Sequence, residues 1–277
     1  MSSQANAQFA SLARPNPVEQ ARHETLPEPL TGLAGLLGLP TFLEFRAGLE
    51  YLRLLNDPVW SQQETRTAAS RPVLLVPGFM GTPASLAPMR QWFQRQGCKA
   101  EVASIGLNAG PSADAAQVVV EDVRRMASES GQKVLIIGHS RGGQHARVAA
   151  VRASEAVEVL VTLGTPLRVI MPNHALVRLP VSLLSGLGRR IATDSQRAAE
   201  ADYERDLLGP LPPDVRHVSV WSKTDGIVDW RVSVDHGVES HRVEGSHFGL
   251  IVNPEVYRAL VPILERTTPR STQGESQ

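Results

Sequence analysis

Residues 134–143 read Val-Leu-Ile-Ile-Gly-His-Ser-Arg-Gly-Gly, and this stretch decides the fold. Four aliphatic residues in a row predict a buried strand, which ends at Gly138. A helical pattern begins at Arg141 and continues to position 152. Ser140 therefore falls in a sharp turn between a strand and a helix, where the backbone is strained. Gly138 and Gly142, two residues away on each side, give that turn the room it needs.

The segments on both sides of this turn alternate between strands and helices. Alternation of this kind predicts an α/β fold, a mostly parallel sheet with helices on both faces. We expect Ser112 to be the N-cap of the long helix that precedes the turn. Further strands are expected over 73–76, 99–103, 157–163, 216–221 and 241–243, and further helices over 84–96, 112–129 and 253–264.

The expected α/β domain covers residues 71–265, and residues 1–70 form an N-terminal arm. The arm is rich in Ser, Gln, Ala and Pro, except for an amphipathic helix predicted over 41–55. Phe42, Phe45, Leu49 and Leu52 share one face of that helix. We expect this helix to pack on the main domain; the alternative is a helix for a lipid surface or a partner. Residues 266–277 are a polar tail.

One long insertion, residues 166–214, interrupts the alternation. It carries several prolines, an apolar run over 181–187 and a charged helical segment over 193–208. Long insertions between strands are usually functional when they are not linkers, so we expect a cap or lid.

Composition excludes several classes of protein. The 277 residues carry 28 Lys and Arg against 28 Asp and Glu, which gives no reason to expect nucleic acid as a partner. A single cysteine, Cys98, cannot form an intramolecular disulfide. The first 17 residues lack the features of a signal peptide, and no apolar stretch is long enough to span a bilayer. We therefore expect a cytoplasmic protein, and peripheral membrane contact is left open.

A serine in such a turn is a candidate nucleophile, and it needs a histidine base and an orienting carboxylate. In this architecture the acid and then the histidine should follow the serine along the chain. His247 is the best base, since it lies in a loop of small residues just before the last helix. His217, His236 and His241 are the weaker alternatives; His139 is expected to lie under the turn, pointing away from the serine.

The acid should follow a strand that precedes the histidine. Asp225 comes after the strand at 216–221, and Gly226 permits a sharp turn there. Asp229 is expected to cap or pair locally and is the second choice, with Asp235 third.

Two backbone N–H groups should stabilise the oxyanion of a tetrahedral intermediate. One is expected from Arg141, directly after the nucleophile. The other is expected from Phe79, in the loop after the strand at 73–76.

These motifs, in this order, resemble the α/β-hydrolase superfamily, and its bacterial lipase and esterase branch in particular. The resemblance implies a serine hydrolase that cleaves carboxylic esters, small or lipid-like, through an acyl-enzyme. An acyltransferase or thioesterase is the alternative, and a non-catalytic binding protein is less favoured. The resemblance to the α/β-hydrolase superfamily is carried by the segments 73–79, 138–143, Leu163-Gly164-Thr165-Pro166, 222–228 and Ser246-His247-Phe248-Gly249.

The sequence departs from that branch at two points. Its first loop begins Pro77-Gly78, where many of those lipases have His-Gly. Phe248 follows His247, where some secreted relatives bind calcium through an aspartate. We therefore expect no metal and no cofactor, since no phosphate loop or nicotinamide motif is present either. The sequence does not indicate an oligomeric state.

Overall fold

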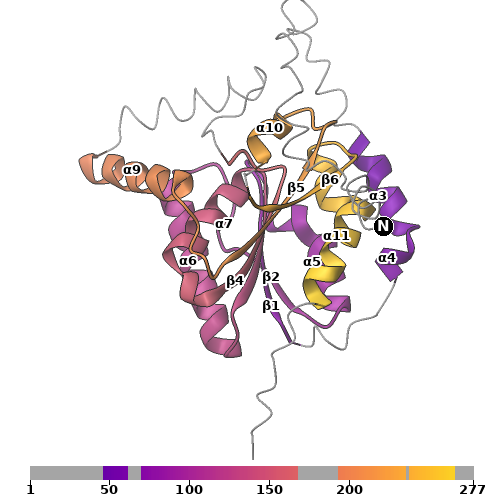
Figure 1. Cartoon of the computed structure of the whole chain (residues 1–277), viewed down its shortest axis with the longest axis horizontal. Helices are drawn as coiled ribbons and strands as arrows, with labels where there is room; N and C mark the ends of the chain where they lie inside the picture. The colour runs from indigo at the N-terminus through magenta and orange to yellow at the C-terminus, as the bar shows by residue number, and fades with distance from the viewer. Residues whose placement is uncertain (1–45, 62–69, 168–192, 235–236, 266–277) are drawn as a thin grey trace, which may run out of the picture. The chain divides into compact units, whose positions relative to one another are not determined.

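The computed structural model of the chain describes residues 46–61, 70–167, 193–234 and 237–265 (Figure 1). Its centre is a six-stranded sheet in the order β2-β1-β3-β4-β5-β6, with every neighbouring pair parallel. This confirms the predicted α/β fold and each of the predicted strands to within two residues. The strands are β1 (Pro72–Val76), β2 (Lys99–Val102), β3 (Val134–His139), β4 (Val157–Leu163), β5 (Arg216–Ser222) and β6 (Glu239–Val243).

The central strands are continuous apolar runs because helices cover the sheet on both faces. Every residue of β1 and β3 is buried, as expected for strands that contact a core on each side. Figure 1 shows the two helical layers on either side of the sheet. The helices are α3 (Ala47–Leu55), α4 (Pro58–Ser61), α5 (Ala87–Arg95), α6 (Ser112–Ser130), α7 (Arg141–Arg152), α9 (Asp194–Leu208), α10 (Trp230–Ser233) and α11 (Pro254–Glu265), with 3-10 helices η3 (Pro83–Leu86), η4 (Ser154–Ala156) and η5 (Phe248–Val252).

The two faces of the sheet have separate cores. On one face, Leu75 and Ile137 belong to a cluster that includes Trp92 of α5 and Tyr257 of α11. On the other face, alternate strand residues such as Ile136 pack against α6 and α7. Because side chains alternate across a strand, each strand contributes to both cores.

The N-terminal helix α3 packs on the domain, as expected, but through a different face. Leu49 and Leu52 are exposed, whereas Glu50 and Leu54 are buried. Leu54 joins the core cluster of α5 and α11, so packing, not the apolar stripe, set the orientation of the helix. Phe42 and Phe45 lie outside the described residues.

The structure differs from the sequence prediction at the start of α6 and describes only part of the expected cap. Ser112 is not the N-cap of α6: Pro111 holds that position, and the Ser112 hydroxyl accepts a hydrogen bond from the Arg141 guanidinium instead. Of the expected cap over 166–214, the charged helix is present as α9, and Thr193 is its N-cap. The apolar run over 181–187 lies outside the described residues.

None of the described helices is both long and apolar enough to cross a membrane.

Candidate active site

Ser140 occupies a strained turn between β3 and α7. Its φ of 55° and ψ of −126° are rare for a residue with a side chain. The turn is held by a 2.8 Å hydrogen bond from the Ser140 N–H to the Leu163 carbonyl of β4. The strand-turn-helix context expected from the sequence is therefore present, and the backbone strain sits at the serine.

Glycines are required around this turn because backbone from two neighbouring segments approaches it. A Cβ on Gly138 would lie 2.4 Å from the Cα of Gly143. A Cβ on Gly142 would lie 2.3 Å from the carbonyl oxygen of Val76. Both distances are far below van der Waals contact, so only glycine lets α7 start this close to β1 and β3.

Asp225 and His247 form a buried pair. Asp225 Oδ2 lies 2.7 Å from Nδ1 of His247, and each side chain is only 2% exposed. The other carboxylate oxygen, Oδ1, accepts hydrogen bonds from the amides of Ile227 and Val228 at 2.9 and 2.7 Å. A carboxylate only accepts hydrogen bonds, so Nδ1 of His247 is the donor in this contact.

The residues next to Ser140 in the structure lie close to this pair. Gly164 directly follows the carbonyl that binds Ser140, and a Cβ on Gly164 would lie 3.1 Å from Asp225 Oδ2 and 3.3 Å from His247 Nδ1. His139, directly before the serine, has its ring 4.8 Å from that of His247. Because β3, β4, β5 and β6 are parallel, the residues after their carboxyl ends meet at one edge of the sheet.

The structure places the alternative residues elsewhere. Asp229 caps α10 through the Arg231 amide and pairs with the Arg231 guanidinium. His241 lies on β6 beside Glu239, and His217 lies beside Thr162 within the sheet. Asp235 and His236 are outside the described residues.

An oxyanion donor must have an N–H that is not already bonded to another group, and the backbone amides of Phe79 and Arg141 meet this condition. Among the described residues, neither N–H has a hydrogen-bond acceptor. For Arg141 the reason is its position at the first residue of α7, where an amide has no partner within the helix. Phe79 lies in the loop after β1, directly before Met80, whose φ is 58°.

A buried network of polar side chains holds the loop after β1, and the sequence did not predict this network. The Asn108 side chain donates to the Pro77 carbonyl at 2.9 Å, and its backbone carbonyl accepts the Met80 N–H at 3.0 Å. Asn108 Oδ1 lies 3.1 Å from Nε2 of His145, whose Nδ1 lies 3.1 Å from the Tyr203 hydroxyl of α9. No motif marks these residues, because they are far apart in sequence and of ordinary type.

Burial lowers the pKa of His145 to about 3, so this imidazole is neutral near pH 7. Its Nε2–H then donates to Asn108, and its Nδ1 accepts the proton of the Tyr203 hydroxyl. His139 is likewise neutral, with a pKa lowered to about 3, mainly by burial and also by the nearby His247. Its Nε2–H donates to the His247 carbonyl at 3.0 Å, so the buried His139 ring contacts the loop that carries His247.

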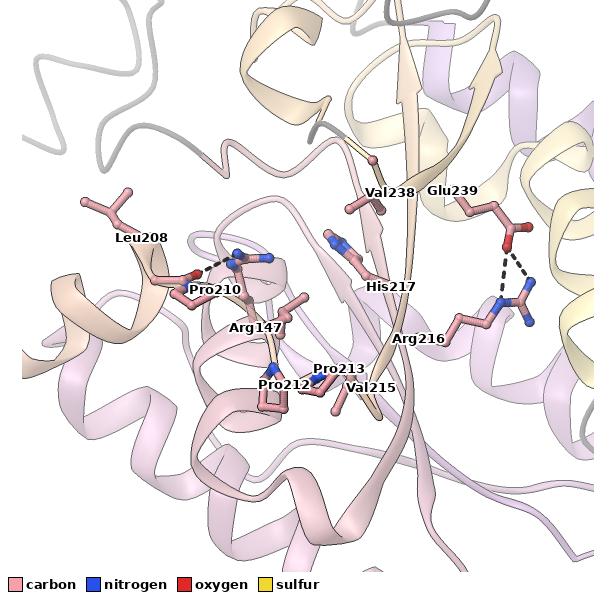
Figure 2. Close-up of a pocket in the computed structure, with 13 residues that line it drawn as sticks. Arg147, Leu208, Pro210, Pro212, Pro213, Val215, Arg216, His217, Val238 and Glu239 are labelled. Carbon is pink, nitrogen blue, oxygen red and sulfur yellow. Dashed lines mark hydrogen bonds and ion pairs between the residues drawn. The ribbon is translucent and has the colours of Figure 1, made fainter.

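A separate pocket of about 610 Å³ lies near the amino ends of β5 and β6, the opposite edge of the sheet from Ser140 (Figure 2). Its charged groups have partners: Arg147 donates to the Gly209 carbonyl, and Arg216 pairs with Glu239. The lining residues include three prolines, at positions 210, 212 and 213. Because the pocket lies at the amino ends of the strands and Ser140 follows the carboxyl end of β3, the pocket is not part of the candidate active site.

In the described parts of the chain, no three His, Cys, Asp or Glu side chains are grouped closely enough to hold a metal ion.

A parallel sheet with a serine at φ 55° after β3, and a buried aspartate–histidine pair after β5 and β6, defines a lipase- and esterase-like α/β-hydrolase fold. Comparison with known sequences gives the narrower group. Residues 113–259, just over half of the chain, match the family described as the PGAP1-like alpha/beta domain. The chain belongs to this family.

Two triacylglycerol lipases are similar over part of their length. The lipase of Burkholderia plantarii is 30% identical over 131 residues, which cover 44% of this chain and 37% of the lipase. The lipase of Pseudarthrobacter phenanthrenivorans is 32% identical over 114 residues, covering 38% of this chain and 36% of the lipase. The matches thus span little more than a third of each relative.

Solved structures share the fold at low sequence identity. The mature lipase BlEst2 of Bacillus licheniformis superposes with a TM-score of 0.54 at 18% identity, covering 71% of this chain and 92% of that one. A monoglyceride lipase of Saccharomyces cerevisiae gives 0.52 at 14% identity, covering 75% and 89%. At these identities the likeness concerns the fold alone.

Proposed function

We propose that the protein is a serine hydrolase that cleaves carboxylic esters with Ser140 as nucleophile, His247 as base and Asp225 as the orienting acid. One observation carries the proposal: a serine in a strained strand-to-helix turn shares a sheet edge with a buried aspartate–histidine pair whose atoms are 2.7 Å apart. This arrangement supports nucleophilic catalysis because an aspartate that binds Nδ1–H selects the tautomer in which Nε2 is the basic nitrogen.

In the first half of the reaction, Ser140 Oγ attacks the acyl carbon of the ester and its proton passes to Nε2 of His247. The imidazolium that forms is stabilised by the Asp225 carboxylate. The carbonyl oxygen becomes an oxyanion and accepts hydrogen bonds from the amides of Phe79 and Arg141. The tetrahedral intermediate then collapses: the ester C–O bond breaks, and His247 gives its proton to the leaving alcohol.

In the second half, water replaces the alcohol. His247 takes a proton from the water as its oxygen attacks the acyl carbon, and the same two amides stabilise the second oxyanion. Collapse breaks the bond to Ser140 Oγ, which regains the proton from His247. The carboxylic acid leaves and the enzyme is restored, with no cofactor consumed.

An apolar acyl group fits the rim of the site. Met80 and Phe248 are 54% and 50% exposed, and they directly follow Phe79 and His247. Exposed apolar side chains next to site residues favour an apolar substrate over a charged one. The relatives named triacylglycerol lipases agree with a lipid-like ester, which we propose as the substrate class.

Labelling with a fluorophosphonate, together with hydrolysis of p-nitrophenyl esters, tests the proposal. We expect the wild-type protein to be labelled at Ser140 and to release p-nitrophenol. Ser140→Ala should lose both properties and remain folded. Ser85→Ala, which removes an exposed hydroxyl bonded only to its own turn, is the matched control and should retain both.

Turnover that survives in Ser140→Ala would overturn the nucleophile. A protein that is neither labelled nor active with acyl chains of any length would favour a binding protein. Product analysis in mixtures of water and alcohol separates hydrolysis from acyl transfer, because only a transferase forms mainly the new ester.

A further inference from the structure

Glu50 is a buried carboxylate that binds the loop carrying His247. It lies on α3, 196 positions before its partner, and is only 3% exposed. Its Oε1 accepts the Ser246 N–H at 2.9 Å, and its Oε2 accepts the Ser246 hydroxyl at 2.7 Å. Both carboxylate oxygens therefore hold the residue directly before His247.

Two glycines of the loop flank the place where the carboxylate enters. A Cβ on Gly249 would lie 1.4 Å from Oε2 of Glu50, and a Cβ on Gly245 would lie 3.4 Å from Oε1. The Ser246 hydroxyl also accepts the Gly249 N–H at 3.1 Å. The carboxylate thus fits between residues on either side of His247 and fixes the backbone there.

Packing alone does not account for a carboxylate at this position. Burying a carboxylate is costly unless hydrogen bonds compensate, and an apolar side chain would pack α3 at lower cost. Among the described residues, no Lys or Arg forms an ion pair with Glu50. Within the described residues its hydrogen bonds both go to Ser246, so its effect is concentrated on the loop of the candidate base.

We propose that Glu50 is a positioning residue for His247: it sets the backbone on one side of the imidazole while His139 holds the His247 carbonyl on the other. This inference rests on the proposed function, since it assigns Glu50 a role only if His247 is the base. Small displacements of a catalytic group reduce turnover strongly, by about 10²-fold for 1 Å. Helix α3 is then part of the catalytic unit, although it precedes the expected boundary at residue 71.

Steady-state kinetics on a soluble p-nitrophenyl ester test this role in the full chain. We expect Glu50→Ala to lower kcat by about 10- to 100-fold with KM within about twofold, because the base is misplaced while the acyl site is unchanged. Glu50→Gln keeps one acceptor oxygen and should recover part of kcat. Ser246→Ala removes the hydroxyl's hydrogen bonds with Glu50 and Gly249 but keeps the amide bond to Glu50, so it should give a smaller loss in the same direction.

Glu255→Gln is the matched control. Glu255 also accepts an amide of this loop, that of Glu244 at 3.1 Å, but at an exposed site. Its substitution should leave kcat within about twofold. If Glu50 only packs α3, its variants will lower stability and leave the kcat of the folded enzyme unchanged, which overturns the inference. If the Glu50 variants do not fold, an unchanged kcat in Ser246→Ala overturns it.

The two proposals fail separately. Activity that persists in Ser140→Ala contradicts the proposed function itself. Loss of activity in Ser140→Ala, together with unchanged kcat in both Glu50→Gln and Ser246→Ala, contradicts the role of Glu50 alone.

Discussion

Nε2 of His139 lies 3.0 Å from the backbone oxygen of His247, so the residue before the candidate nucleophile holds the residue proposed as the base. The two imidazole rings are 4.8 Å apart. Since burial keeps His139 neutral, its single N–H donates to that carbonyl at neutral pH. The turn after β3 and the loop after β6 are thereby connected without use of the His247 side chain.

The first prediction concerns this hydrogen bond. His139→Ala should lower kcat by about tenfold and also destabilise the protein, because a buried carbonyl loses its donor. His139→Gln keeps an N–H donor and should retain more of both. Ester hydrolysis and urea unfolding of the two variants measure these effects. Equal kcat in all three proteins would show that the contact does not position His247.

The second prediction separates the two candidate acids. Asp225→Asn should reduce kcat by about 10⁴-fold, since an amide in place of the carboxylate no longer holds the Nδ1–H tautomer. Asp229→Asn is the matched control, because its remaining oxygen still caps α10 and only an ion pair with Arg231 is lost. It should change kcat by less than about twofold. The reverse order of effects would make Asp229 the acid.

The third prediction uses two glycines with similar backbones. Gly164 and Gly131 have φ of 53° and 65°, so an alanine at either strains the chain by about 1 kcal/mol. At Gly131 the new Cβ meets nothing within 4 Å, whereas at Gly164 it lies 2.7 Å from Leu250 and close to Asp225 and His247.

Gly131→Ala should therefore destabilise the protein with kcat unchanged, and Gly164→Ala should also lower kcat, by more than about tenfold. Thermal unfolding measures the change in stability, and ester hydrolysis by the same samples measures the change in kcat. Identical kcat in the two variants would contradict the close approach of Gly164 to the Asp225–His247 pair.

The fourth prediction concerns acid. The pKa of His145 is lowered by burial from 6.5 to about 3, so between these values the unfolded chain binds a proton that the folded chain does not. The free energy of unfolding is unaffected by this group above pH 6.5. It falls as the pH drops towards 3, by about 1.4 kcal/mol for each pH unit.

His145→Gln should reduce that slope, because glutamine does not titrate and can still bond to Asn108 and Tyr203. Urea unfolding at several pH values between about 7 and 5 measures the slope. An unchanged slope in the variant would show that His145 takes up no proton on unfolding in this range. The contribution of His139 remains in both proteins.

Local chemistry explains why the central motif could be predicted from the sequence. The strand at 134–137, the turn at Ser140 and the helix from Arg141 depend on neighbours a few residues away, so β3 and α7 form where the pattern indicated. The chain order of parallel strands also implied that residues after β3, β5 and β6 share one edge. Asp225 was predicted because it follows a strand that precedes the histidine, and His247 because it lies in a loop of small residues before the last helix; the structure brings their side chains together.

Contacts between distant segments depend on packing, which no local pattern encodes. Helix α3 was predicted with its leucine stripe on the domain, yet Leu49 and Leu52 are exposed and Glu50 is buried. That orientation follows from the fit of Leu54 in the core and of the Glu50 carboxylate between two glycines some 200 residues later. The sequence by itself thus determined the sheet, the strained serine and the Asp225–His247 pair. Only the tertiary structure decided which side chains hold them in place, because those contacts arise where separate helices and loops meet.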